Sequence, residues 1–185
     1  MFRLAATLAL LLALPVAAQE AATPEPLPDA AAERLANGTR FGTWTLGCEA
    51  VAVGETACLL SQRVARTSDG AFLADFLLFP NPQAEGEVYL AARVAAGAYL
   101  PSGFVLRGEG APEDSQRQLV WQTCAGAVCE ALLSLPEADI AALEDGGDVI
   151  AAYRPSVQSE AVIFRFSVAG AQAGLEALVR ASGGN

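Results

Sequence analysis

The chain has 185 residues, enough for one domain, and carries 11 arginines, no lysine and 21 acidic residues, for a net charge of −10 at pH 7. This excess of negative charge disfavours binding to nucleic acid or anionic lipid. Histidine is absent, which excludes Ser-His-Asp and Cys-His nucleophile systems and histidine-based zinc sites.

The N-terminus has the three-part pattern of a secretory signal peptide. One arginine precedes the apolar run 4–14, Pro15 follows it, and small residues occupy positions 16–18. The run is too short to span a bilayer, so we predict a signal peptide over residues 1–18 rather than an N-terminal core helix. No later stretch is long enough for a membrane span, so no transmembrane segment is expected after signal cleavage. Residues 19–38, rich in alanine, proline and glutamate, are predicted to be a flexible arm, and residues 39–182 a single β-rich domain.

Alternating apolar residues predict a series of short strands. In the first, Trp44, Leu46 and Cys48 share a face; in the second, Gln62 shares a face with apolar residues, so its amide should point inward and need hydrogen-bond partners. Trp44 and Trp121 lie mid-strand and are expected in the core. About ten strands with turns between them predict an antiparallel β-sandwich or barrel-like domain. The expected strands include residues 43–48, 57–64, 71–79, 87–94, 104–107, 118–123, 130–133, 149–153 and 161–168.

Two short helices are predicted near the C-terminus. Ser134 is the expected N-cap of the first, with Glu137 three residues later, Ile140 on the apolar stripe, and two glycines at 146–147 to end it. The second covers about residues 171–180. Its inward-facing residues are expected to be Leu175, Leu178 and Val179.

The four cysteines, Cys48, Cys58, Cys124 and Cys129, are an even number in a chain predicted to be exported, which indicates disulfides. Of the three possible pairings we favour Cys48–Cys58 and Cys124–Cys129, because a glycine-containing turn lies within each pair and opposed hairpin residues have the separation a disulfide needs. A thiol-redox site would use Cys-x-x-Cys near a βαβ unit, and a four-cysteine zinc site would use two tight pairs. Neither pattern is present, so no metal and no cofactor is expected.

Five motifs are typical of one family in their order and spacing: FGTWTLGCE (41–49), CLLSQ (58–62), PSGFVL (101–106), CAGAVCEA (124–131) and FSVAG (166–170). Over about residues 41–179 the chain thus resembles the invasion-associated locus B family of bacterial envelope proteins. Two positions depart from the family pattern, since Val128 stands where glycine is usual and Ala171 where an aromatic residue is usual. The resemblance implies a β-rich fold, export and disulfides, but no reaction and no catalytic residue.

The leading functional hypothesis is an exported non-enzymatic protein, periplasmic or secreted, that binds or maintains an envelope or protein partner not identified by the sequence. A second is a periplasmic hydrolase built on paired carboxylates, for which Glu109, Glu113 and Asp114 are candidates in one loop. Charged loop residues are, however, solvated by default. A third is a lectin-like or lipid-binding sandwich. A concave pocket and the residues that line it would distinguish the three.

Overall fold

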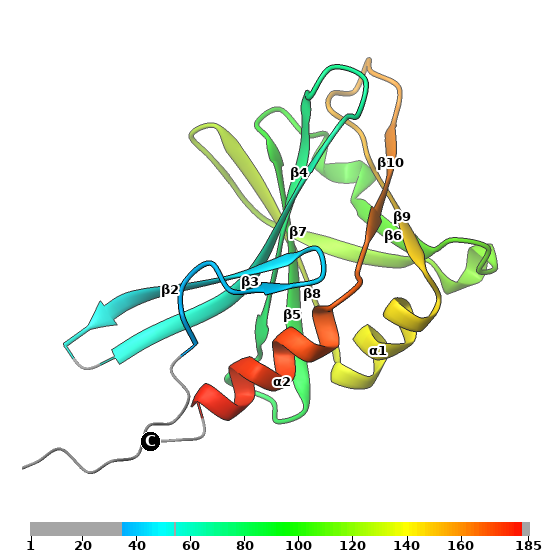
Figure 1. The fold of residues 1–185 in the computed structure, drawn as a ribbon. Helices are drawn as coiled ribbons and strands as arrows, with labels where there is room; N and C mark the ends of the chain where they lie inside the picture. Colours follow the sequence, from blue (N-terminus) through cyan, green and yellow to red (C-terminus); the bar gives the residue numbers. More distant parts are fainter. Residues whose placement is uncertain (1–34, 54, 183–185) are drawn as a thin grey trace, which may run out of the picture. The chain divides into compact units, whose positions relative to one another are not determined.

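The computed structural model describes residues 35–53 and 55–182, which form a ten-stranded antiparallel sheet and two α-helices (Figure 1). Across the sheet the strand order is β1-β2-β3-β4-β5-β8-β7-β6-β9-β10. The mainly β fold with two helices is therefore confirmed. The strands are β1 (Arg40–Phe41), β2 (Trp44–Ala52), β3 (Glu55–Ala65), β4 (Phe72–Pro80), β5 (Glu87–Ala95), β6 (Phe104–Gly108), β7 (Arg117–Ala125), β8 (Val128–Pro136), β9 (Asp148–Tyr153) and β10 (Val162–Ser167), and the helices are α1 (Glu137–Asp145) and α2 (Ala171–Ser182).

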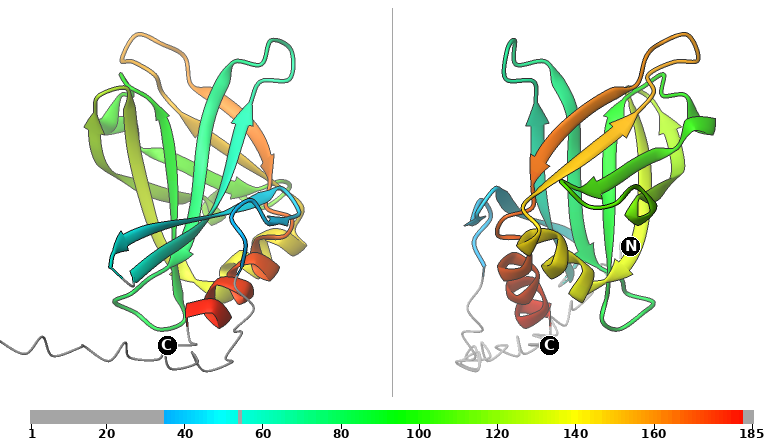
Figure 2. Two further views of the ribbon diagram at one scale, coloured as in Figure 1. Left: turned by 60° about the vertical axis from the view of Figure 1, so that its left-hand side comes forward. Right: turned by 90° about the vertical axis from the view of Figure 1, so that its right-hand side faces the viewer.

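The sheet changes direction at β7, which pairs with different strands along its two halves. Residues 117–119 pair with β6, whereas residues 120–125 pair with β8. The strands β6, β9 and β10 consequently face the β3–β5 part of the sheet, as the two views of Figure 2 show. One face of every strand thereby points into a shared core.

Aromatic rings fill this core between the two parts of the sheet. Phe76 of β4 stacks on Phe166 of β10, with ring centroids 3.9 Å apart, and Phe104 of β6 stacks on Tyr153 of β9 at 5.9 Å. Burial raises the pKa of the Tyr153 phenol. Trp44 is fully buried and donates its indole N–H to the carbonyl of Val168 at 3.3 Å, so its predicted core position is confirmed.

The start of β2 and the chain after β10 meet in a contact that we call the closing junction, formed by residues 41–44 and 167–170. The Thr43 N–H donates to the Ala169 carbonyl at 3.1 Å, and the Thr43 hydroxyl reaches the Ser167 carbonyl at 3.1 Å. Gly42 and Gly170 have φ values of 56° and 88°. A Cβ on Gly42 would overlap the Ala169 carbonyl oxygen, and one on Gly170 would overlap the Phe41 carbonyl. Glycine is therefore required at both positions by conformation and by space.

The two helices lie side by side at one end of the sheet (Figure 1). Near the end of α1, the Glu144 carboxylate accepts hydrogen bonds from the backbone N–H groups of Gly170 (2.6 Å) and Gln172 (3.0 Å). A negative charge is favourable at a helix N-terminus, so α1 caps α2. In α2, Gly174 lies against the side chain of Leu60, where a Cβ would meet its methyl carbon. The helix therefore packs closely on the core face of β3.

Two details of the predicted helices are wrong. Ser134 does not cap α1, because it lies in β8 opposite Tyr89 and donates its hydroxyl proton to the Glu87 carboxylate at 2.6 Å. Pro136 directly precedes α1, and no side chain caps that end. Val179, expected to face inward, is 45% exposed. Pairing with β5 extends β8 to Pro136, through the residues that the capping pattern predicts as the start of the helix.

The predicted signal peptide, residues 1–18, and residues 19–34 of the predicted arm lie outside the described residues. The end of that arm contacts the sheet: the Asn37 side-chain amide donates to the Cys48 carbonyl at 2.9 Å, and the Gly38 N–H donates to the Leu46 carbonyl at 2.8 Å. Within the described part of the chain, no helix combines the length and apolar character needed to cross a membrane.

We expect Gly42→Ala to lower the free energy of unfolding by about 3 kcal/mol or more, since it combines an unfavourable positive φ with overlap at the closing junction. Gly70→Ala is the matched control, because Gly70 has a φ of 71° but nothing within 4 Å of the added Cβ, so its loss should be about 1–2 kcal/mol. Urea unfolding followed by tryptophan fluorescence measures both. Equal losses would show that steric overlap at the junction is unimportant.

Candidate functional site

Each disulfide joins directly opposed residues near the end of a hairpin. Cys48 pairs with Cys58 across β2 and β3, and Cys124 with Cys129 across β7 and β8. These are the two local pairings that the sequence favours, and they use all four cysteines. Beyond the first disulfide, Val53 is fully exposed and packs against nothing. The disulfides hold the two turns, while the inner-face residues make the core.

A row of inward-facing residues crosses five neighbouring strands. Gln62 on β3 lies opposite Phe76, and the row continues through Ala92 and Ala131 to Trp121 on β7. The Gln62 Oε1 and Trp121 Nε1 atoms are buried, and neither has a hydrogen-bond partner among the described residues. The prediction that Gln62 points inward is thus confirmed, but the partners it was expected to need are not found among these residues. Such an unpaired acceptor reduces stability.

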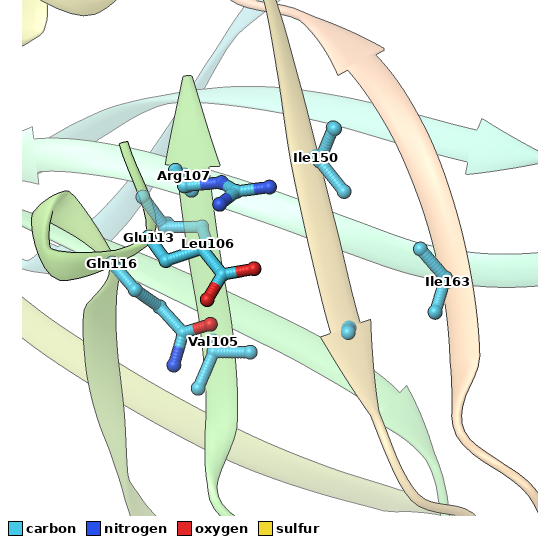
Figure 3. Close-up of a pocket in the computed structure, with 8 residues that line it drawn as sticks. Val105, Leu106, Arg107, Glu113, Gln116, Ile150 and Ile163 are labelled. Atoms are coloured by element: carbon cyan, nitrogen blue, oxygen red, sulfur yellow. The ribbon is translucent and has the colours of Figure 1, made fainter. Parts of the chain in front are cut away.

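The outer face of β6, β9 and β10 carries an open hollow of about 580 Å³ (Figure 3). Its apolar floor includes Ile150 of β9 and Ile163 of β10, and Ile163 is 69% exposed. Glu113 and Gln116 reach it from the loop that follows β6, and Arg107 from β6 itself. Two cross-strand rows underlie this face, Val105–Ala152–Ile163 and Arg107–Ile150–Arg165.

The charged groups at this hollow differ in their partners. Arg165, beside the hollow, forms an ion pair with Glu109 at 2.8 Å. Arg107 and Glu113 take part in none of the ion pairs found among the described residues. The hollow therefore combines an apolar floor with a free guanidinium, a free carboxylate and an amide. This combination suits an amphipathic group better than a purely apolar one.

The three carboxylates predicted as hydrolase candidates are not brought into a cleft. Glu109, Glu113 and Asp114 are all exposed, and of these Glu113 alone lines the hollow. Across residues 35–53 and 55–182 no aspartate or glutamate is buried. In the same ranges no three His, Cys, Asp or Glu side chains come together as a possible metal site.

The sequence analysis did not predict this hollow. Arg107, Gln116, Ile150 and Ile163 come from separate segments, and only the strand order β6-β9-β10 brings them together. The available signal was the pair of isoleucines at outward positions, where strands of a one-sided sheet usually carry polar residues.

The fold and the two disulfides define the class of this protein: a disulfide-closed, antiparallel β-domain with two packed helices. A model of the Invasion associated locus B (IalB) protein family matches residues 44–179, and the chain belongs to this family. The crystal structure of invasion associated protein B from Bartonella henselae is similar, with a TM-score of 0.64 at 15% identity over 78% of this chain and 96% of that chain. At this identity the likeness concerns the fold alone. Among curated proteins, no sequence matches.

Replacing Cys48 and Cys58 together by alanine is expected to lower the free energy of unfolding by about 2–3 kcal/mol, the loop-entropy value for so short a closed loop. Denaturant unfolding of the double variant beside the wild type measures this. The wild type in excess reductant, which opens both loops, should lose more. An unchanged unfolding midpoint would contradict a stabilising role for this disulfide.

Gln62→Met is expected to raise the free energy of unfolding by about 1 kcal/mol, because it removes a buried acceptor without a partner at nearly constant volume. Gln122→Met is the control, since Gln122 is exposed and should respond little. Thermal and urea unfolding give the comparison. A loss of stability in Gln62→Met would mean that this amide has a hydrogen-bond partner in solution.

Proposed function

We propose that this protein is an exported, non-enzymatic component of the bacterial envelope, periplasmic or secreted, that binds a protein partner. The observation that carries the proposal is the combination of two short disulfide loops with the lack of any buried aspartate or glutamate among the described residues. Disulfides form and persist in oxidising compartments, which agrees with the signal pattern of residues 1–18. Such a domain offers a rigid surface rather than an acid–base site.

A ligand-binding sandwich is the second candidate, and the hollow of about 580 Å³ is the observation in its favour. Its volume lies in the range of small-molecule sites. Its polar groups, Arg107, Glu113 and Gln116, stand at one side of an apolar floor that is open to solvent. Because small-molecule sites usually bury most of their ligand, a protein surface fits this hollow better.

Export is tested by expressing the full chain with a C-terminal tag in a Gram-negative host and measuring the intact mass of the periplasmic fraction. We expect a mature chain that begins at Gln19 with four oxidised cysteines. Ala18→Leu, which removes the small residue at the cleavage point, should stay unprocessed. Cytoplasmic retention or free thiols in the wild type would contradict the proposal.

Partner binding is tested in the source bacterium by producing the tagged chain there, cross-linking before lysis and purifying it. A deletion strain of the source bacterium, examined for envelope defects, gives an independent measurement. We expect a specific cross-linked partner that is absent from the Ala18→Leu strain. Turnover of a glycan or peptide substrate by the purified chain, with no partner recovered, would overturn the proposal in favour of an enzyme.

A further inference from the structure

The two edges of the sheet differ in how they are covered. At one edge β1 pairs with β2, and beyond β1 the Asn37 amide hydrogen-bonds both the N–H and the carbonyl of Cys48, as a neighbouring strand would. At the other edge β10 pairs with β9, and the described chain supplies no strand on its second side. The closing junction reaches β10 only at Ser167, and no other described segment makes a backbone hydrogen bond to residues 162–166 on the side away from β9.

This edge lacks most of the features that prevent strand addition. All six residues of β10 pair with β9 in regular register, without a bulge, and the strand contains neither proline nor lysine. Its one charged residue, Arg165, points to the outer face, where it pairs with Glu109 and keeps 64% of its side chain exposed. The uncovered backbone N–H and carbonyl groups can therefore pair with another extended chain.

The neighbouring side chains specify the chemistry of that chain. A strand added beside β10 would extend each of the two cross-strand rows on the outer face by one residue. One added residue would lie next to Ile163 and the other next to Arg165. Cross-strand neighbours favour an apolar residue beside Ile163 and an acidic residue beside Arg165. On the inner face, the added strand would border Phe164 and Phe166, which favours apolar residues again.

We propose that β10 is a docking strand, to which an extended peptide segment of a partner protein adds with alternating apolar and acidic side chains on its outer face. The apolar side chain then lies beside Ile163 at the border of the hollow, and the acidic one lies beside Arg165 as a second carboxylate next to Glu109. This inference rests on the proposed function and names its surface and the chemistry of its partner.

The probe for the test is a synthetic nine-residue peptide with valine and glutamate alternating on the face that would extend the outer rows and valine on the face that would border Phe164 and Phe166. Binding to the purified, oxidised protein is measured by calorimetry, and hydrogen exchange of residues 162–166 is followed with and without the peptide. We expect saturable binding and slower exchange in that segment. The same peptide with lysine in place of glutamate should bind at least tenfold more weakly because lysine would face Arg165.

Variants of the protein locate the site. Ile163→Lys and Arg165→Glu, both at exposed positions, should weaken binding of the glutamate peptide at least tenfold, and Arg165→Glu should favour the lysine peptide. Val51→Lys is the matched control, since Val51 is 63% exposed on the strand near the opposite edge, and it should bind within twofold of the wild type. Circular dichroism checks that all three variants fold.

Backbone pairing is separated from side-chain attraction by N-methylation of the peptide at alternate amides. Only one of the two alternate sets faces β10 in an added strand, so one methylated peptide should lose binding and the other should retain it. No saturable binding, equal losses from both sets, or equal effects of Ile163→Lys and Val51→Lys would each overturn the proposal. A cellular partner that cross-links equally to Arg165→Glu would overturn this site while leaving the proposed function intact.

Discussion

The closing junction is the contact on which the rest of the fold depends. Its hydrogen bonds join Thr43 to residues 124 and 126 positions later, so the first and last parts of the sheet meet there. The same residues fix Trp44 through the Val168 carbonyl and place the start of α2, which Glu144 then caps. Two glycines with positive φ permit the backbones to approach so closely. Core, helix packing and sheet closure therefore share one set of contacts.

Much of this fold could be predicted from residue periodicity, because a strand with one buried face repeats every second residue. The alternation of Trp44 and Leu46 fixes a buried face within a single segment. Both halves of the closing junction also lie in sequence motifs, at 41–49 and 166–170. The motifs do not show that the two segments touch, because contact between distant segments depends on strand order. The predicted N-cap role of Ser134 is wrong for a related reason. The capping pattern involves residues close in sequence, whereas the strand that pairs with Ser134, β5, is distant in sequence.

The hollow shows the same limit more strongly. Residues that line it, such as Arg107 and Ala152, are unremarkable in their own segments and become neighbours only through the β6–β9 pairing. The cysteine pairing, in contrast, can be predicted from the sequence, because each pair closes a hairpin whose register depends on residues close together in the chain. The sequence therefore predicts contacts within a hairpin well, whereas a binding surface forms only when distant strands assemble into the sheet. Gln62 lies between these cases, because its direction follows from alternation but its hydrogen bonding does not.

An uncovered edge strand in a concentrated compartment carries a risk of self-association, and the charges of this chain act against it. A second copy would bring its own Arg165 to the interface and a further net charge of −10. Arginine facing arginine disfavours that pairing, whereas a single acidic side chain on a short segment can share Arg165 with Glu109 and carries far less of the opposing negative charge. The opposite edge needs no such selection, because β1 and Asn37 already occupy it. The β10 edge thus favours a strand of a partner protein over the β10 of a second copy. Arg165 and Ile163 are the residues that would select that strand.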